Sequence, residues 1–374
     1  MSAARPPASL RGPSHAKGGA SAGLRRFAAG RIPVRERTGP LLPANAASRG
    51  ARPLLPEGGG EAAHAASLGG VAPCAALPTP DLVLGFDDYD APAARFAEAI
   101  GVRYATIAVH HFPDGESRVT LPVPLPASVA MCRSLHCPNG KLVETILAAE
   151  AARHNGASFV SLVAPYLCYM RQDIAFHPGE AVSQRIVGGW LADRFDAVVT
   201  VDPHLHRVAT LAEAVPAKAA IALSAAASFG SFLRGREPDA LLVGPDEESA
   251  QWLAAAARGH RFDTVVGRKA RRGDRDVEVE LPAGRLEGRA AVLVDDMAST
   301  GATLAIAARR CLEHGARSVD VLVVHGLFVG EAVGELRHAG VRHVWSTDSV
   351  PHPTNALALA PLLAGAFRGA VSPG

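Results

Sequence analysis

The fold of this chain is indicated most clearly by residues 290–310, which read AAVLVDDMASTGATLAIAARR. A run of small and branched apolar residues, typical of a buried strand, ends in the acids Asp295 and Asp296. A loop of small residues follows, and the next stretch predicts a helix over 303–316. A strand, polar loop and helix in this order are typical of a parallel α/β sheet.

The loop after the two acids predicts a site for a sugar phosphate. Backbone N–H groups at a helix N-terminus bind anions, and hydroxyl groups add donors. Asp295 and Asp296 cannot bind phosphate, but they suit the vicinal hydroxyls of a ribose or a metal ion that bridges to it. The alternative is an ordinary helix cap beside two solvated acids. The residues expected to bind the phosphate are Ser299, Thr300, Gly301, Ala302 and Thr303.

The same alternation of apolar runs and helical segments extends over residues 81–374. It occurs twice and breaks near residues 220–238. We therefore expect two similar α/β domains with mostly parallel sheets, at residues 81–225 and 226–374, with ligands at the carboxyl ends of the strands. Strands are expected at 81–86, 104–112, 129–135, 158–167, 197–204, 240–246, 290–297, 318–328 and 341–348, with two more within 264–281. Helices are expected at 91–101, 140–156, 183–195, 247–259, 303–316 and 331–340, and near 355–368.

Residues 1–80 differ from the rest of the 374-residue chain in composition. Ala, Gly, Pro, Arg and Ser dominate this segment, which carries a net charge of +7, whereas residues 81–374 carry −5. The segment has too little patterned apolar surface to offset its ordering entropy, so we expect a disordered extension. Its Arg-rich, acid-poor composition is similar to that of an organellar transit peptide. Alternatively, the segment could contact anionic partners or have no function.

Composition also limits the class of protein. Aromatic residues make up only 5% of the chain, and the acidic body disfavours broad phosphate-backbone contacts, so no nucleic-acid partner is expected. No apolar run is long enough to predict a transmembrane helix. Five dispersed cysteines form no CxxC pair, which favours a reduced, cytoplasmic protein.

Polar residues follow two further predicted strands. Asp202 and His204 end the strand AVVTVDPH, and Asp246 ends ALLVGPD. Carboxylate and imidazole groups from two strand ends can hold Mg²⁺ with several waters retained, as phosphoryl transfer requires. The alternative for His204 is a histidine that is merely hydrogen-bonded.

Several short segments, in this order, resemble the ribose-phosphate diphosphokinase (PRPP synthetase) family. They are FPDGE (112–116), PYLCYMRQD (165–173), VDPH (201–204), GPD (244–246), Lys269-Ala270-Arg271, VHGLF (324–328) and TDSVPHP (347–353), with VLVDDMASTGATL as the ribose-5-phosphate signature. The resemblance covers about residues 82–368. It implies two phosphoribosyltransferase-type domains, and an Mg²⁺-dependent transfer of the diphosphoryl group of ATP to ribose 5-phosphate, giving PRPP and AMP.

The resemblance also assigns roles to individual residues. Phe112, Asp114 and Glu116 would form part of an ATP site in a neighbouring subunit, which implies a homo-oligomer, a dimer or a hexamer. Arg171 and Gln172 would bind ATP within the same chain. The residues alone leave simpler alternatives: a tight Pro-Asp-Gly turn for the first group, and an ion pair between Arg171 and Asp173 for the second.

The charged stretch RKARRGDRD (268–276) matches the flexible catalytic loop of the family, with Lys269 and Arg271 as the catalytic cations. A solvated charged hairpin is the alternative. His204 and Asp246 would help bind the metal of Mg·ATP. Two other functions compete with this interpretation: a phosphoribosyltransferase that consumes PRPP, and a catalytically silent regulatory homologue.

Overall fold

The computed structural model describes residues 77–272, 276–282 and 284–368, with the backbone alone for 269–272 and 276–278. The first half of this body contains a seven-stranded sheet in the order β3-β2-β1-β4-β5-β6-β7. All its strand pairs are parallel except β2 with β3. Its strands are β1 (Leu82–Phe86), β2 (Arg103–His111), β3 (Ser117–Thr120), β4 (Ser128–Cys132), β5 (Phe159–Ala164), β6 (Ala197–Val201) and β7 (Ala219–Leu223).

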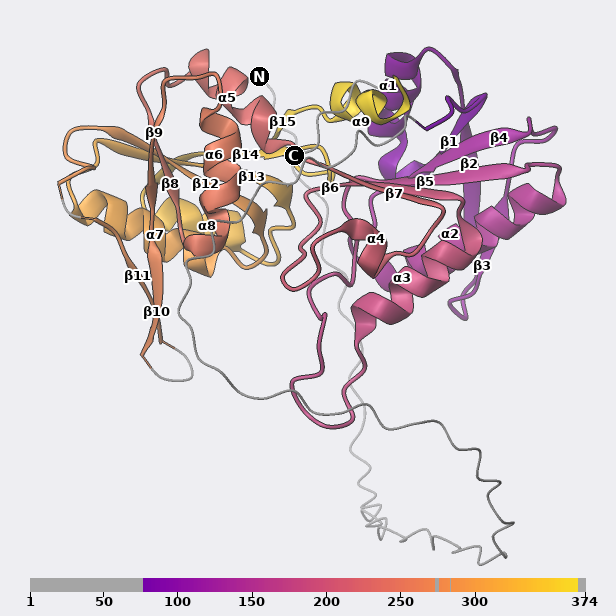
Figure 1. Cartoon of the computed structure of the whole chain (residues 1–374), viewed down its shortest axis with the longest axis horizontal. Coiled ribbons are helices and arrows are strands. Elements are labelled where there is room, and N and C mark those ends of the chain that lie inside the picture. The colour runs from indigo at the N-terminus through magenta and orange to yellow at the C-terminus, as the bar shows by residue number, and fades with distance from the viewer. Residues whose placement is uncertain (1–76, 273–275, 283, 369–374) are drawn as a thin grey trace, which may run out of the picture. The chain divides into compact units, whose positions relative to one another are not determined.

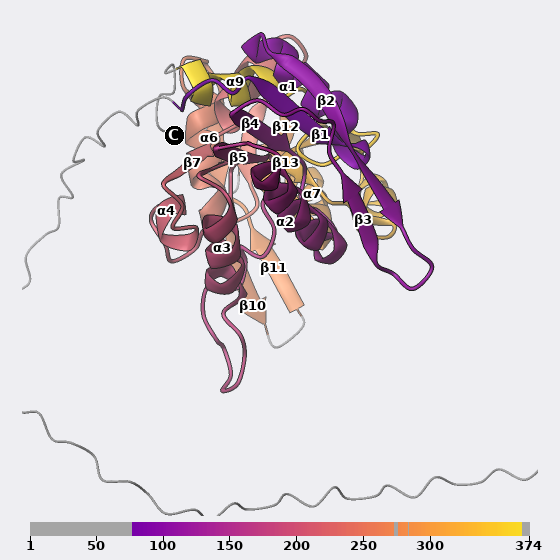
Figure 2. The same ribbon diagram turned by 90° about the vertical axis from the view of Figure 1, so that its right-hand side faces the viewer.

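The second half contains a six-stranded, all-parallel sheet in the order β15-β14-β13-β12-β8-β9. A separate antiparallel hairpin, β10 (Arg268–Arg272) with β11 (Asp276–Glu280), extends away from it (Figure 1, Figure 2). The strands of the sheet are β8 (Leu241–Gly244), β9 (Asp263–Val266), β12 (Ala290–Ala298), β13 (Ser318–Gly326), β14 (Val341–Thr347) and β15 (Asn355–Leu357). Two mostly parallel α/β sheets are therefore confirmed.

Helices connect the strands. In the first half they are η1 (Asp87–Tyr89), α1 (Asp90–Ile100), α2 (Pro138–His154), α3 (Ser183–Arg194) and α4 (Leu211–Ala214). In the second half they are α5 (Ala226–Arg234), η2 (Glu247–Ser249), α6 (Ala250–Ala257), α7 (Ala302–Glu313), α8 (Ala332–His338) and α9 (Ala360–Arg368). Most of these are predicted from the sequence, but η1, α4 and α5 are not.

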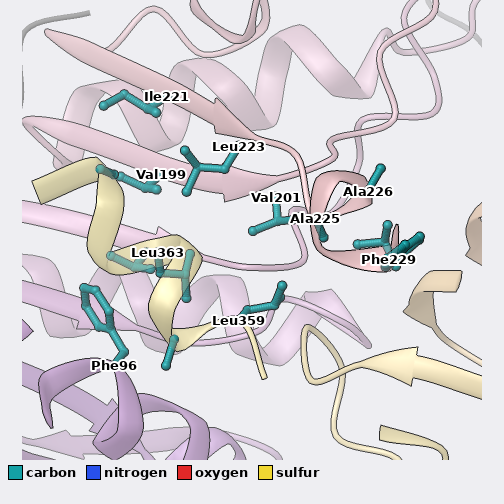
Figure 3. Packing of buried hydrophobic residues seen from close by; sticks show 14 of the residues in the cluster. Phe96, Val199, Val201, Ile221, Leu223, Ala225, Ala226, Phe229, Leu359 and Leu363 are labelled. Carbon is teal, nitrogen blue, oxygen red and sulfur yellow. The ribbon is translucent and has the colours of Figure 1, made fainter. Parts of the chain in front are cut away.

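Successive side chains of the central strands enter different cores, because they point to opposite faces of the sheet. In β1, Leu82 and Leu84 join the core beneath α2 and α3, whereas Val83 joins a cluster that also includes residues of α1 and α9. In β12, Leu293 packs toward α7, whereas Val292 joins that same cluster with residues of α5 and α6. One apolar core is thus shared by the two halves (Figure 3).

The last helix belongs spatially to the first half. Helix α9 lies beside α1 (Figure 1), and the rings of Phe96 and Phe367 have centroids 5.5 Å apart. Asp348 strengthens this junction: its carboxylate accepts hydrogen bonds from Arg95 at 2.8 Å and from the Leu359 backbone at 2.7 Å. The expected division at residues 225/226 falls between β7 and α5, so α9 packs across it.

Residues 77–80 also belong to the folded body. Leu77 is buried, and its backbone N–H donates to Ala366 in α9. The extension expected over residues 1–80 is therefore too long by four residues, and its remainder, 1–76, lies outside the described residues. Within the described part of the chain, no helix is long and apolar enough to cross a membrane.

Candidate active site

A cleft of about 800 Å³ lies where the strand ends of the two halves meet. The carboxyl ends of β6, β8 and β12 supply most of its polar residues, as expected for parallel sheets. Most of the predicted phosphate, metal and ribose residues share this one cavity. Its lining consists of Arg171, His204, His206, Asp246–Glu248, Arg268, Glu280 and the continuous stretch Asp295–Leu304.

The loop between β12 and α7 is held in shape by backbone contacts. Gly301 begins α7 with a φ of +76°, a left-handed conformation that favours glycine. The Val329 N–H donates to the Ser299 carbonyl at 2.9 Å, and the Phe328 N–H donates to the Ala298 carbonyl at 3.0 Å. The segment after β13 thus fixes the loop, which leaves the hydroxyls of the loop residues at the cleft.

The two acids at the end of β12 have different environments. Burial raises the pKa of Asp295 well above its usual value, and the charges of Asp296 and Asp246 raise it further. Asp296 is buried, and its Oδ2 lies 2.6 Å from Nδ1 of His204. Burial alone would lower the pKa of His204, but the hydrogen bond and charge of Asp296 outweigh this and raise it. Asp295 accepts the backbone N–H of Asp296 through Oδ1 at 3.0 Å, so its Oδ2 is the atom left to accept from a bound ligand.

The cleft is rich in negative charge. Among the lining residues with described side chains, six are acids (Asp246, Glu247, Glu248, Glu280, Asp295 and Asp296) and two are arginines (Arg171 and Arg268). A cavity of this kind accepts phosphate groups only together with cations. Carboxylate oxygens such as those of Asp246 and Asp295 are the ligands that Mg²⁺ prefers, so the donor set fits that ion.

Asp202 does not face this cleft. It is only 8% exposed, and its two carboxylate oxygens accept from the Ala225 N–H at 2.8 Å and from Nε1 of Trp252 at 3.1 Å. With both oxygens bonded inside the protein, it fills a structural role between β6 and α6. The expectation that Asp202 binds metal is therefore not supported by its position.

The two residues expected to bind ATP within the chain, Arg171 and Gln172, lie where two neighbouring pockets adjoin. Arg171 lines the main cleft and contacts the sulfur of Met297. Gln172 lines a neighbouring pocket of about 540 Å³, which Arg171 also borders, and accepts a hydrogen bond from Ser183 at 3.2 Å. The alternative ion pair of Arg171 with Asp173 does not form, because Asp173 pairs with Arg207 at 2.7 Å.

Phe112, Asp114 and Glu116 lie at the turn between β2 and β3 and line neither pocket. The turn is exposed, and the residues at its two ends, His111 and Ser117, are held by a carboxylate. Oε1 of the buried Glu144 accepts from Ser117 Oγ at 2.9 Å and lies 2.8 Å from Nε2 of His111. Glu144 thus holds the residues on both sides of the 112–116 turn.

The expected catalytic cations, Lys269 and Arg271, occupy alternate positions of strand β10. Their side chains lie outside the described residues, so their role stays a prediction. The neighbouring Arg268 and Glu280, at the base of the hairpin, line the cleft. The hairpin therefore begins and ends at the cavity.

Sequence reasoning assigned no role to five charged or polar residues that line the cleft: His206, Glu247, Glu248, Arg268 and Glu280. Nδ1 of His206 lies 3.4 Å from Oε1 of Glu248, and the rings of His204 and His206 have centroids 4.2 Å apart. The signal that could have found His206 is its spacing of two residues from His204.

Comparisons with known proteins agree with this architecture. A family model for the N-terminal domain of ribose phosphate pyrophosphokinase matches residues 83–193, and one for the phosphoribosyl transferase domain matches residues 211–353. A ribose-phosphate pyrophosphokinase of Methanopyrus kandleri is 36% identical over 280 residues, which cover 73% of this chain and 94% of the relative. The chain belongs to the ribose-phosphate pyrophosphokinase family.

Other members of the family show the same extent of similarity. A ribose-phosphate pyrophosphokinase of Halobacterium salinarum is 34% identical over 277 residues, covering 74% of this chain and 96% of the relative. The crystal structure of a phosphoribosylpyrophosphate synthetase from Mycobacterium smegmatis has a TM-score of 0.66 at 23% identity, covering 77% of this chain and 98% of that one, which shows a shared fold. This member of the family is accordingly an enzyme with two phosphoribosyltransferase-like domains.

Proposed function

We propose that the chain transfers the diphosphoryl group of ATP to the C1 hydroxyl of ribose 5-phosphate, giving PRPP and AMP, in the presence of Mg²⁺. The observation that carries this proposal is the single cleft that joins the loop 299–303 with Arg171, His204 and Asp246. A sugar phosphate and the phosphates of a nucleotide can meet in such a cavity. The relatives named ribose-phosphate pyrophosphokinase support the same reaction.

In this proposal the sugar phosphate binds at the start of α7. Backbone N–H groups and the hydroxyls of Ser299, Thr300 and Thr303 donate to the 5-phosphate. Asp295 accepts hydrogen bonds from the ribose hydroxyls, while Asp296 holds His204. The oxygen of the C1 hydroxyl then attacks the β-phosphorus of ATP, the bond from that phosphorus to the α–β bridging oxygen breaks, and AMP leaves. The hydroxyl proton passes to solvent.

Positioning and electrostatics dominate phosphoryl transfer, so no protein base is required. Asp246 and His204 would hold Mg²⁺, which would neutralise negative charge of the polyphosphate when bound. Arg171 and Gln172 bind the nucleotide from this chain. Lys269 and Arg271 bring positive charge to the transferring group from the β10–β11 hairpin.

The exposed turn 112–116 fits a role outside its own chain, because it lines neither of the two pockets described above and its base is fixed by Glu144. Phe112, Asp114 and Glu116 would then complete the ATP site of a second copy. A homo-oligomer, a dimer or a hexamer, follows from this proposal, and a cytoplasmic location stays a prediction.

Phosphorus NMR of the purified chain with ATP, Mg²⁺ and ribose 5-phosphate tests the reaction. We expect PRPP and AMP in equal amounts, and ADP in place of AMP would contradict the diphosphoryl transfer. Lys269→Ala should lower kcat at least about 100-fold while leaving ribose 5-phosphate binding unchanged. The exposed Lys218→Ala, whose ammonium pairs with Asp196 in the first half, is the control.

A further inference from the structure

A buried carboxylate in α2 lies against the turn that would complete the ATP site of a second copy. Glu144 is 3% exposed, and it lines neither the cleft nor the neighbouring pocket that Gln172 borders. We propose that Glu144, fixed by Arg133, is a positioning residue that acts on the nucleotide site of a neighbouring copy rather than on the site of its own chain. This inference rests on the proposed function, in which the 112–116 turn reaches into a second copy.

The turn itself sets only its own shape. The Phe112 N–H donates to the Glu116 carbonyl at 2.8 Å, and the Gly115 N–H donates to the Phe112 carbonyl at 3.0 Å. Strand β3, which follows the turn, is the outermost strand of the first sheet and pairs there with β2. The position of the turn relative to the body therefore depends on contacts at its two ends.

Glu144 contacts both ends with one oxygen. His111 and Ser117 lie opposite each other in the β2–β3 pair, one before the turn and one after it. Oε1 of Glu144 accepts from Ser117 Oγ at 2.9 Å and lies 2.8 Å from His111 Nε2. Burial alone would raise the pKa of Glu144, but its hydrogen bonds, first of all that from Arg133, lower it. The side chain is therefore a charged acceptor near neutral pH, to which both strand ends can donate.

Arg133 leaves Glu144 a single orientation. The guanidinium is buried, and its Nη2 donates to Oε2 of Glu144 at 2.6 Å. Nε donates to Asp88 at 3.0 Å, Nη1 donates to the Lys141 carbonyl at 3.3 Å, and the guanidinium lies over the ring of Phe86. A buried charge network whose members are all hydrogen-bonded holds its surroundings rigidly. Glu144 is thus fixed by Arg133 on one side and fixes the turn on the other.

The exposed side chains of the turn indicate an effect outside the chain. Phe112 is 39% exposed, and Asp114 and Glu116 are exposed as well. Groups that bind a ligand need supporting bonds that hold them to within about 0.5 Å of their working positions. Neither of the two pockets described above is lined by these three residues, so the support from Glu144 reaches a nucleotide in a neighbouring copy.

Kinetics of variants at the two ends of the turn test this role. The double variant His111→Ala/Ser117→Ala removes both donors to Oε1 but keeps the buried pair of Glu144 with Arg133. We expect its KM for ATP to rise at least about tenfold, while kcat and the KM for ribose 5-phosphate stay within about threefold. Glu144→Gln, with one acceptor oxygen in place of two, should raise the same KM. Thr120→Ala, at an exposed position of β3, is the control.

Mixed oligomers separate an effect on the neighbour from an effect on the same chain. Asp295→Asn should inactivate a cleft but leave the turn intact, whereas the double variant leaves the cleft intact. The two chains are co-expressed with different tags and purified by both, so that some sites combine an intact cleft with an intact turn. We expect these mixed oligomers to make PRPP with a KM for ATP within about threefold of that of the parent chain. Neither variant alone should do so.

Three results would overturn the inference. They are an unchanged KM for ATP in both the double variant and Glu144→Gln, mixed oligomers whose KM stays as high as that of the double variant, and synthesis of PRPP by a monomer. Circular dichroism checks that each variant is folded, and the side chain of His111 is 68% exposed, so its replacement carries little risk. A parent chain that makes no PRPP contradicts the proposed function instead. ATP binding measured by calorimetry then makes the same comparison of variants and mixed oligomers.

Discussion

Asp202 and Asp295 occupy similar places in the two halves, each at the carboxyl end of a buried parallel strand, yet they face different surroundings. Asp202, just after β6, is enclosed by donors from Ala225 and Trp252. Asp295, near the end of β12, lines the cleft beside the acids Asp296 and Asp246. At Asp295, Oδ1 accepts the Asp296 N–H at 3.0 Å, and Oδ2 remains for a ligand. A strand-end carboxylate is thus available to a ligand only where the protein does not supply donors to both of its oxygens.

The largest difference between the two acids should be in activity. Asp295→Asn should lower kcat/KM for PRPP synthesis at least about 100-fold, because an amide NH₂ cannot accept from the ribose hydroxyls. The same change should raise the free energy of unfolding, since it removes a buried charge next to two others. Initial rates and urea unfolding measure both effects. An activity within threefold of the parent chain would remove Asp295 from the site.

Asp202 should show the opposite pattern. Asp202→Ala leaves the Ala225 N–H and Trp252 Nε1 without acceptors, and should lower the free energy of unfolding by about 3 kcal/mol. The exposed Asp239→Ala should change it by less than about 0.5 kcal/mol. Urea unfolding of both variants checks this. If Asp202→Ala is as stable as the parent chain but fails to bind Mg²⁺, then Asp202 is a ligand after all.

The pH dependence of stability also tests whether Asp202 is enclosed in the protein, in contrast to Asp295 at the cleft. Burial raises the pKa of Asp202 from 3.8 to about 6. The folded state then holds this proton more tightly, so its contribution to stability is present below pH 3.8 and is lost as the pH rises through about 6. Asp202→Asn lacks this proton. The stability of the parent chain relative to Asp202→Asn should therefore fall by about 1.4 kcal/mol per pH unit between those pKa values.

Measurements of unfolding for both proteins between pH 5 and pH 7.5 would show this fall and then a plateau above about pH 6.5. A relative stability that rises with pH would show that donors to the Asp202 carboxylate outweigh its burial.

The smallest effect is expected at a third acid near a strand end. Glu247 follows β8, but it is exposed and its nearest ion-pair partner, Arg268, lies 3.9 Å away. Glu247→Gln should change the free energy of unfolding by less than about 0.5 kcal/mol. Thermal unfolding at low and at high salt measures it, and a larger loss that disappears in salt would reveal a wider charge network.

Much of the fold could be predicted because central strands such as β5 and β6 are continuous apolar runs, and helices such as α1 and α7 are amphipathic. Strand β7 was not expected, because its sequence AAIAL is short and rich in alanine, and only its pairing with β6 defines it. The docking of α9 on α1 could not be predicted either. It depends on Phe96 and Phe367, which are far apart in the chain and have no local pattern in common.

In the candidate site, too, local sequence patterns predicted some features, while features that depend on distant contacts could not be predicted. The stretch 295–303 could be predicted because its acids, glycine and hydroxyls follow one another closely in the sequence. The inward position of Asp202 could not, because Trp252, which donates to it, comes from the other half of the body. His206 and Glu248 come together only because β6 and β8 end at the same cleft.

The position of the last helix has a consequence for how the chain is made. Arg368 of α9 donates to the carbonyl of Ala99 in α1, a partner 269 residues earlier in the sequence. At about 5–20 residues per second of synthesis, the apolar face of α1 stays exposed for on the order of 10 to 50 seconds before α9 has been made. The first half therefore emerges from the ribosome with its core open, and its completion is timed by the arrival of the chain's final turns.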